Sequence, residues 1–336
     1  MVLLLGPIAL AFLLQTPAAE PLKIPTTEQM MQEAAAITPQ ATTPFARQLL
    51  AGYGCLQPIQ PIVVYYNKET RKALSEADGA KMTETERTGF EKKDIDDTFY
   101  YFTRYGTPVA FMRPTEILGR AGIKGADGLK LVDFGFGSIG QLHSLASMGA
   151  DVTGIEVDPL LELIYAREPG KVVRCSQAAR GGRDGSIDLA YGQFPKDPAV
   201  VKKVGGGYDA FVSKNTLKRG YVHPEREVNP RMLVHLDVDD ETFVRAVYDA
   251  LKPGGLFLIY NLCPAPSKPE EDYKPWGDGR SPFSKETYEK VGFNVLAFDV
   301  DDTEAAHIMG KTFGWGTDEE LAKNFFGMYT LVQKKK

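Results

Sequence analysis

The sequence predicts an α/β fold in which a doubly wound, mostly parallel seven-stranded sheet follows an N-terminal helical extension. Two observations predict it. From residue 129 onward, short apolar runs alternate with helix-length segments, which favours a parallel sheet with helices on both faces. The first of these runs, residues 129–134, leads directly into glycines, as expected where a strand turns into a helix around a ligand.

Residues 1–19 have the features of an export signal or a short membrane anchor. No charged side chain precedes Glu20, residues 2–14 are almost wholly apolar, and small residues follow at 16–19, which is typical of a cleavable leader. No basic residue precedes the apolar run, so a misassigned start or a buried helix is the alternative. We expect an exported, periplasmic or membrane-anchored protein, with any membrane contact confined to residues 1–19, and a cytoplasmic location otherwise.

Residues 20–128 are predicted to form a linker and a helical N-terminal extension. The first part, residues 20–45, is rich in Pro, Thr, Ala and Gln, and we expect a loosely packed arm there that contains one short helix. Between residues 83 and 105, apolar side chains recur at spacings of four and three, which predicts a helix.

Residues 129–336 form the predicted sheet domain. The predicted helices of this domain cover residues 139–148, 159–167, 242–251 and 285–291. The seven predicted strands cover residues 129–134, 151–156, 187–191, 209–213, 256–261, 293–298 and 328–332.

A glycine loop with nearby acids is the main functional signal. Gly135, Gly137 and Gly140 follow the first predicted strand in the pattern GxGxxG, which is typical of nucleotide-binding turns. Asp133 lies two residues before the first glycine, and Glu156 ends the next strand, 21 residues after Gly135. A carboxylate at that strand end can accept hydrogen bonds from both hydroxyls of a ribose. An acid beside the loop suits a cationic ligand better than a phosphate.

These residues carry a family resemblance. The segment Asp133-x-Gly135-x-Gly137, then Glu156, then Leu-Lys-Pro-Gly-Gly at residues 251–255, resembles the class I (seven-strand) S-adenosylmethionine-dependent methyltransferases. The resemblance covers roughly residues 100–336. It implies a Rossmann-like doubly wound sheet, S-adenosylmethionine as cofactor, and methyl transfer to a small-molecule or protein acceptor. Gly140 departs from the family pattern, because the family often has this glycine one residue earlier.

The resemblance also implies roles for individual residues. Gly135 and Gly137, with Gly140 after them, would line the methionine part of the cofactor, with Asp133 near its amino group. Glu156 would hold the ribose, and Val157 would pack on the adenine. Gln193 stands where the family commonly has an acid that meets the adenine amino group, and its amide oxygen can accept the same hydrogen bond.

The acceptor is expected beyond the carboxyl ends of the strands, where open α/β sheets bind their ligands. Residues 213–224 follow the fourth predicted strand and contain Asn215, Tyr221 and His223. We predict these three as catalytic residues. His223 is the candidate base, because the ordinary pKa of histidine lies near 6.5.

Composition excludes several other functions. The 39 basic and 44 acidic residues give a net charge of −5, which disfavours a nucleic-acid partner. The three cysteines are far apart without CxxC spacing, so neither a disulfide framework nor a cysteine zinc site is expected. His223-x-Glu225 and His235-x-Asp237 have metal-ligand types but are interpreted as polar loop residues, and no metal site is predicted.

Two alternatives to a methyltransferase stay open. The chain could have a methyltransferase-like fold that binds a ligand without turnover, since the third glycine and Gln193 depart from the family pattern. An NAD-dependent oxidoreductase would also use the glycine loop, but Asp133 and the Leu-Lys-Pro-Gly-Gly segment argue against it.

Overall fold

The computed structural model describes residues 26–336 apart from 103–105, 169, 177 and 179–181, and within them eight strands form the central sheet. Their order is β10-β11-β9-β8-β4-β5-β7-β6, and the five strands at the centre run parallel. The strands are β4 (Lys130–Phe134), β5 (Asp151–Glu156), β6 (Lys171–Val172), β7 (Gly185–Tyr191), β8 (Tyr208–Lys214), β9 (Leu251–Cys263), β10 (Phe293–Asp301) and β11 (Phe326–Lys334).

The predicted fold class is confirmed. All seven predicted strands are present, and the sheet is Rossmann-like and mostly parallel, with β11 antiparallel to both β9 and β10. The Leu-Lys-Pro-Gly-Gly segment opens β9, as the resemblance implied. The eighth strand, β6, was not predicted, because its two residues are too short to show a pattern and it forms only by pairing with β7.

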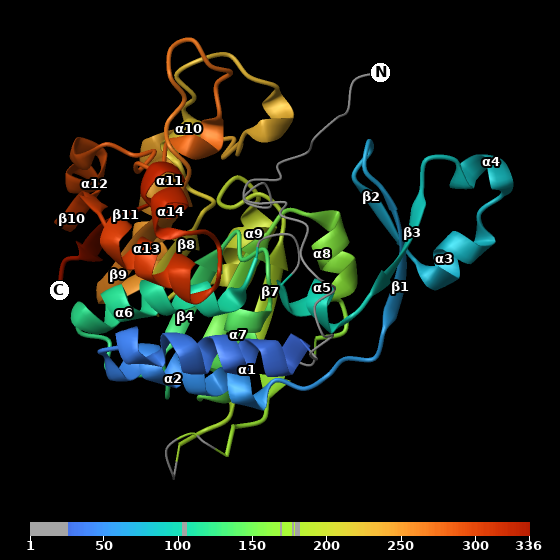
Figure 1. Cartoon of the computed structure of the whole chain (residues 1–336), viewed down its shortest axis with the longest axis horizontal. Coiled ribbons are helices and arrows are strands. Elements are labelled where there is room, and N and C mark those ends of the chain that lie inside the picture. The colour runs from blue at the N-terminus through green and yellow to red at the C-terminus, as the bar shows by residue number, and fades with distance from the viewer. Residues whose placement is uncertain (1–25, 103–105, 169, 177, 179–181) are drawn as a thin grey trace.

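Helices cover both faces of the sheet because successive strand residues point to opposite sides. On β4, Leu131 belongs to one buried cluster and Val132 to the other; Ala210 and Phe211 divide in the same way on β8. The first cluster includes residues of α1 (Thr26–Ile37), α2 (Pro44–Gly52), α6 (Met112–Arg120), α7 (Gly140–Ser147), α8 (Pro159–Ile164) and α13 (Thr303–Thr312) (Figure 1). The second includes residues of α9 (Pro198–Val204), α11 (Asp240–Ala250) and α12 (Lys285–Val291).

The described part of the N-terminal extension is tightly packed, so the prediction of a loose arm is wrong for residues 26–45. Met30, Ile37 and Phe45 are fully buried in the same cluster as Leu131 of the central sheet. The polar and proline residues begin helices instead of loosening the chain: the Thr43 side chain accepts a hydrogen bond from the backbone of α2, and a proline occupies its first turn.

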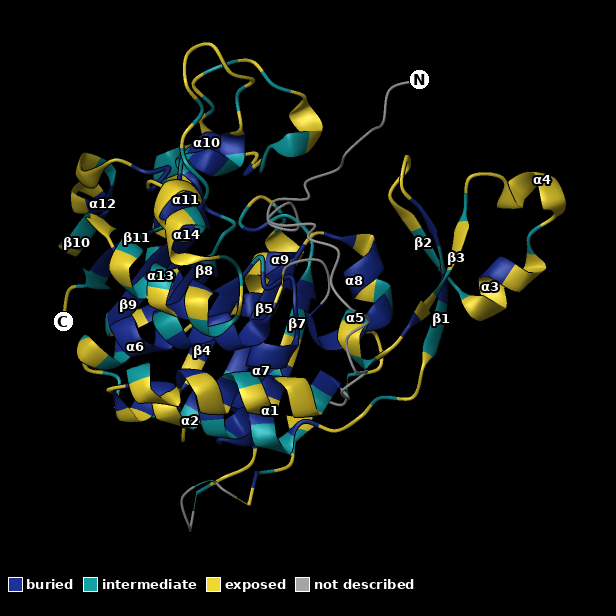
Figure 2. Cartoon of the chain, in the orientation of Figure 1, coloured by how far each residue is buried: buried dark blue, intermediate teal, exposed yellow. Residues whose placement is uncertain are grey.

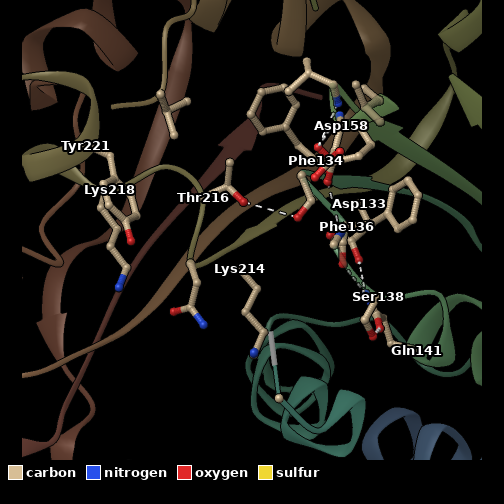
Figure 3. A pocket seen from close by; sticks show the side chains of 18 of the residues that line it. Asp133, Phe134, Phe136, Ser138, Gln141, Asp158, Lys214, Thr216, Lys218 and Tyr221 are labelled. Carbon is tan, nitrogen blue, oxygen red and sulfur yellow. Dashed lines mark hydrogen bonds between the residues drawn. The ribbon is translucent and has the colours of Figure 1, made fainter. Parts of the chain in front are cut away.

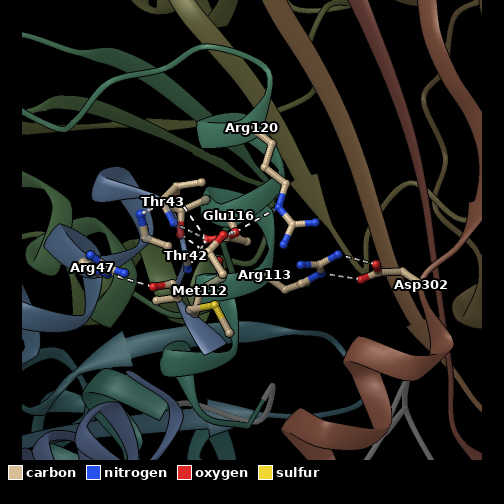
Figure 4. A network of polar contacts seen from close by, with 11 residues as sticks. Thr42, Thr43, Arg47, Met112, Arg113, Glu116, Arg120 and Asp302 are labelled. Atoms are coloured by element: carbon tan, nitrogen blue, oxygen red, sulfur yellow. Dashed lines mark hydrogen bonds and ion pairs between the residues drawn. The ribbon is translucent and has the colours of Figure 1, made fainter. Parts of the chain in front are cut away.

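A buried carboxylate links two segments of the N-terminal extension through hydrogen bonds (Figure 4). Glu116 on α6 has no exposed surface and accepts hydrogen bonds from the backbone and the hydroxyl groups of Thr42 and Thr43. Arg120 donates to the same carboxylate at 2.9 Å. Burial raises the pKa of Glu116, but these hydrogen bonds outweigh it and hold the pKa below its usual range. One turn away, Arg113 pairs in bidentate fashion with Asp302 before α13.

A second, three-stranded sheet was not predicted. It has the order β2-β1-β3 and is antiparallel; it lies to one side of the central sheet, and much of it is exposed (Figure 2). The helix predicted over residues 83–105 is therefore wrong for residues 91–95, which form a strand that pairs with β1. This region contains β1 (Ile62–Asn67), β2 (Lys72–Ser75), α3 (Glu76–Lys81), α4 (Glu84–Arg87), β3 (Glu91–Ile95) and α5 (Asp97–Phe102).

The remaining described helices are short. They are α10 (Arg219–Val222), α14 (Asp318–Asn324) and five 3-10 turns at Thr38–Gln40, Tyr53–Cys55, Pro108–Phe111, Pro230–Met232 and Pro275–Gly277. Among the described residues, no helix combines the length and the apolar character that a membrane span requires. The leader predicted at residues 1–19 lies outside the described residues.

Cys55 and Cys175 form a disulfide with a Cα–Cα distance of 5.7 Å, contrary to the expectation from their spacing. The two residues are 120 positions apart. They meet because the 3-10 turn that ends at Cys55 packs against α7, while the backbone N–H of Cys175 donates to Ser147 at the end of the same helix. The disulfide therefore ties the N-terminal extension to the sheet domain. Cys263 is a buried free thiol.

Candidate functional site

A cavity of about 270 Å³ lies at the carboxyl ends of β4, β5 and β8 (Figure 3). In the chain, β5 follows β4 on one side of the sheet, whereas β8 pairs with β4 on the other side. The strand order thus reverses at β4, and ligands of open α/β sheets bind at such a reversal. The N-terminal extension closes the cavity from one side through Thr107, Pro108 and Phe111.

The glycine loop forms one wall, as predicted. Gly135 and Gly137 line the cavity with backbone φ angles of 67° and 57°, a region that residues with a Cβ atom rarely adopt. A Cβ atom on Gly135 would also lie 2.3 Å from the Thr216 hydroxyl, which donates a hydrogen bond to the Gly135 carbonyl. Glycine is therefore required here both by conformation and by the close approach of the loop after β8.

Asp133 ends β4 inside the cavity and is almost completely buried. Gln141 donates to its Oδ2 at 3.0 Å, and Ser138 in turn donates to Gln141, which fixes the carboxylate. The other oxygen, Oδ1, is buried and has no hydrogen-bond partner among the described residues. Burial raises the pKa of Asp133 to about 7, although Gln141 and the charge of Lys214 lower it. An unsatisfied buried acceptor of this kind fits a ligand that donates a hydrogen bond or carries a positive charge.

Glu156 ends β5 on the same wall and is 8% exposed. Its carboxylate accepts hydrogen bonds from the backbone N–H groups of Val157 at 2.8 Å and of Gly137 and Asp158 at 3.3 Å. Burial raises the pKa of Glu156, and these hydrogen bonds oppose the shift. Because one of them comes from the glycine loop, the orientation of the carboxylate and the shape of the loop depend on each other.

Val157 and Gln193 line the cavity beside Glu156, as predicted. Val157 is 50% exposed, which is unusual for a large apolar side chain at a strand end and leaves a surface against which a flat ring can pack. Gly140 does not line the cavity, which corrects its predicted role. A Cβ atom there would lie 2.7 Å from Pro108, so this glycine allows α7 to pack closely against the N-terminal extension.

Two lysines, Lys214 and Lys218, come from β8 and the loop after it (Figure 3). The ammonium of Lys218 is fully buried and donates to the backbone carbonyls of Leu262 at 2.6 Å and Trp276 at 3.3 Å. Lys214 is half-buried, and its ammonium has no hydrogen-bond or ion-pair partner among the described residues. Burial lowers the pKa of each lysine to about 8.

The predicted catalytic residues divide into two groups. Asn215 and Tyr221 line the cavity; Asn215 has a left-handed backbone with φ 64° and accepts a hydrogen bond from Leu262 N–H at 2.7 Å. Their catalytic roles stay predictions. His223 is not among the described residues that line the cavity. Its Nε2 lies 2.9 Å from Asp240 at the start of α11, so the structure does not support it as the base.

Several residues that line the cavity were not predicted from the sequence. Gln141 is the second residue of α7, and its contact with Asp133 depends on how the helix leaves the glycine loop. Arg71 comes from the turn between β1 and β2, and Arg231 and His235 come from the loop before α11. The His-x-acid pairs serve other purposes: Glu225 pairs with Arg280, Asp237 pairs with Lys196, and His235 contacts the Pro230 carbonyl. Only the folded chain brings these segments to one cavity.

The acidic and the basic residues of the cavity come from different segments of the chain. The acids Asp133, Glu156 and Asp158 come from the ends of β4 and β5 and the residues just after them. The lysines come from β8 and the loop after it (Figure 3). Phe111, Met232 and Leu233 add apolar surface to the cavity. Such a cavity can hold a ligand with cationic and hydroxyl groups on the acidic side.

Comparison with known proteins gives resemblances at low identity. No protein-family profile and no curated protein matches this sequence. Among solved structures, the chain is similar to an S-adenosylmethionine-dependent methyltransferase from Mesorhizobium loti, with 18% identity over 64% of this chain and 95% of that one and a TM-score of 0.34. It is also similar to phosphoethanolamine N-methyltransferase 2 from Haemonchus contortus in complex with S-adenosyl-L-methionine, with 14% identity over 93% and 75% of the two chains and a TM-score of 0.38. A further similar structure is the [4+2]-cyclase SpnF, with 17% identity over 94% and 98% and a TM-score of 0.41.

Proposed function

We propose that this chain binds S-adenosylmethionine in the cavity and transfers its methyl group to a small-molecule acceptor. The observation that carries this proposal is the pair of buried carboxylates, Asp133 and Glu156, at the ends of adjacent parallel strands beside a glycine loop. Glu156 is oriented by three backbone N–H groups and can accept from ribose hydroxyls. The unsatisfied oxygen of Asp133 suits an ammonium group.

The same residues argue against a dinucleotide. A pyrophosphate is bound by the free N–H groups at a helix N-terminus. Here Gln141 in the first turn of α7 bonds Ser138, Asp133 and the Phe136 carbonyl, which holds the Asp133 carboxylate beside the start of this helix. A phosphate at that place would also lie close to the Asp133 carboxylate. The acidic wall therefore favours a cationic ligand.

Methyl transfer requires mainly that the acceptor be aligned and water be excluded, because the bound cofactor supplies an already activated methyl group. The chain provides both functions. Phe111 from the extension and Met232 and Leu233 from the loop before α11 form apolar walls, and Asn215 and Tyr221 offer polar groups beside them. The acceptor would bind between these walls. The walls come from three separate segments and enclose little space, which favours a small molecule over a folded protein.

Calorimetric titration with S-adenosylmethionine, S-adenosylhomocysteine and NAD tests the cofactor. The proposal predicts binding of the first two and none of NAD. Binding of NAD in place of the other two would instead support an oxidoreductase.

Turnover is tested with methyl-labelled S-adenosylmethionine and two fractions of a cell extract, one of small molecules and one of proteins. We expect label in the small-molecule fraction. Label in the protein fraction would move the acceptor class to proteins. Cofactor binding without transfer to either fraction would favour a methyltransferase-like binding protein without turnover.

We also propose that residues 1–19 are an export signal or a membrane anchor. The apolar run at 2–14 followed by small residues supports this, and the Cys55–Cys175 disulfide fits an oxidising compartment. Because S-adenosylmethionine is made inside cells, an anchored domain that faces the cytoplasm is the competing arrangement. Fractionation of cells that express the full chain and a chain that begins at Glu20, with protease treatment of intact cells, distinguishes the two.

A further inference from the structure

Asp133 and Lys214 carry opposite charges in one cavity without forming an ion pair. Each lines the cavity, and each influences the pKa of the other through its charge. No contact within ion-pair distance joins them, although both side chains are described. Oδ1 of Asp133 has no hydrogen-bond partner among the described residues, and the ammonium of Lys214 forms no hydrogen bond or ion pair with them. Because both residues line one cavity, a single ligand bound there can contact both.

The backbone places both side chains on the same face of the sheet. β4 and β8 are parallel neighbours in which Asp133 lies opposite Val212. Side chains two residues apart on a strand share a face, so Lys214 projects on the same face as Val212 and Asp133. This is the face covered by the N-terminal extension, because Leu131 and Val212 belong to the cluster that contains α1 and α2.

Asp133 is held through its side chain, and Lys214 is held through its backbone. Gln141 holds Asp133 from the side of α7. The backbone of Lys214 is held by the following residue, since Asn215 bonds Tyr260 and Leu262 of β9 through its backbone and its side chain. Lys218, four residues on, satisfies its ammonium with two carbonyls. Lys214 has no such structural partner, which leaves its charge available to a ligand.

The chemistry of the proposed cofactor fits this pair. S-adenosylmethionine carries a sulfonium and an α-ammonium, so an uncompensated lysine ammonium beside it would repel it. Its one anionic group is the α-carboxylate, which is attached to the same carbon as the α-ammonium. We propose that Asp133 and Lys214 together form a receptor for this amino-acid end, in which Asp133 accepts from the α-ammonium and Lys214 donates to the α-carboxylate. The inference rests on the proposed function and adds that Lys214 selects ligands that keep the carboxylate.

Ligands that lack parts of the amino-acid end test this directly. The affinities of wild type, Lys214→Met and Lys214→Arg are measured by calorimetry for S-adenosylmethionine, for decarboxylated S-adenosylmethionine and for 5′-methylthioadenosine, which lacks the whole amino-acid end. Lys202→Met serves as the matched control, because Lys202 is an exposed lysine on α9 that does not line the cavity. Melting temperatures of all variants are recorded alongside.

We expect wild type and Lys202→Met to bind S-adenosylmethionine about tenfold or more tightly than the decarboxylated ligand, the size of a charge-assisted hydrogen bond. Lys214→Met should lose this preference and bind 5′-methylthioadenosine as wild type does, whereas Lys214→Arg should keep most of it. Equal affinity of wild type for the two ligands overturns the inference without any variant. An unchanged preference in Lys214→Met overturns it as well. If wild type binds none of the three ligands, the proposed function itself fails.

Discussion

Asp133 is central to the proposed binding site, but its ionised carboxylate lowers the stability of the folded chain. Burial raises the pKa of Asp133 to about 7, above the ordinary value near 4. Between these two values the folded chain holds a proton that the unfolded chain has lost, so the free energy of unfolding falls as the pH rises through this window. Because ionisation of Asp133 destabilises the fold, the presence of this carboxylate is consistent with a role in binding rather than in stability.

Replacing Asp133 by Asn should therefore stabilise the ligand-free protein at high pH. Melting temperatures of wild type and Asp133→Asn should converge near pH 4, diverge in favour of the variant as the pH rises to about 7, and keep a constant difference above that. The variant should also bind S-adenosylmethionine at least about tenfold more weakly, because it loses a charged acceptor. As a control, Asp127→Asn should show the opposite sign at neutral pH, since a hydrogen bond from Arg183 and its pairing with Arg174 lower the pKa of Asp127. Parallel pH profiles for wild type and Asp133→Asn would refute this account.

At the level of single residues, sequence reasoning located residues of the cavity where the signal is local. Asp133, the first two glycines and Glu156 belong to strand ends and a turn whose conformation depends on adjacent residues. It failed for Gly140 and His223, because their neighbours, Pro108 and Asp240, come from other segments of the chain. Nothing in the local sequence indicates those contacts.

At the level of elements, β4, β5, β8 and β9 of the central sheet were predictable because they are buried on both faces and read as apolar runs. The strand at residues 91–95 was not, because it is largely exposed and charged and owes its conformation to pairing with β1. The packing of residues 26–52 was underestimated for a related reason, since α2 packs against the distant α6 and α7, and α1 packs against α5 and α13.

The contribution of the Glu116 hydrogen bonds to the stability of the extension can be measured by mutation. Glu116→Gln keeps the size of the side chain but replaces one acceptor oxygen by a donor, which leaves Thr42 or Thr43 without a partner. We expect a loss of about 2–4 kcal/mol in the free energy of unfolding, measured with urea. Glu319→Gln on α14, where the carboxylate pairs with exposed Lys323, should cost less than about 0.5 kcal/mol. Similar losses for the two variants would contradict the importance given to the buried network.

At the level of the whole molecule, the extension and the sheet domain share one apolar cluster and are joined by the Cys55–Cys175 disulfide. The fold class followed from the alternation of elements, but the disulfide and the second sheet did not, because both depend on contacts between distant segments. The cavity depends on the same contacts, since Phe111 and Arg71 reach it from the extension.

The disulfide is checked by counting thiols. The denatured, unreduced protein should react with one equivalent of alkylating reagent, at Cys263, and with three after reduction, as measured by mass spectrometry. The double variant Cys55→Ala/Cys175→Ala should lose about 2–5 kcal/mol of stability, because a long loop is no longer closed in the unfolded chain. Three reactive thiols before reduction would show that the bond is absent.

The central claim is that the cavity at the ends of β4, β5 and β8 binds S-adenosylmethionine through Glu156. Calorimetric titration of wild type, Glu156→Ala and Glu162→Ala with S-adenosylhomocysteine tests it most directly, since Glu162 is an exposed acid on the neighbouring helix α8. We predict that Glu156→Ala binds at least about tenfold more weakly than wild type, because ribose loses a charged acceptor, and that Glu162→Ala binds as wild type does. Equal affinity of Glu156→Ala and wild type would contradict the claim.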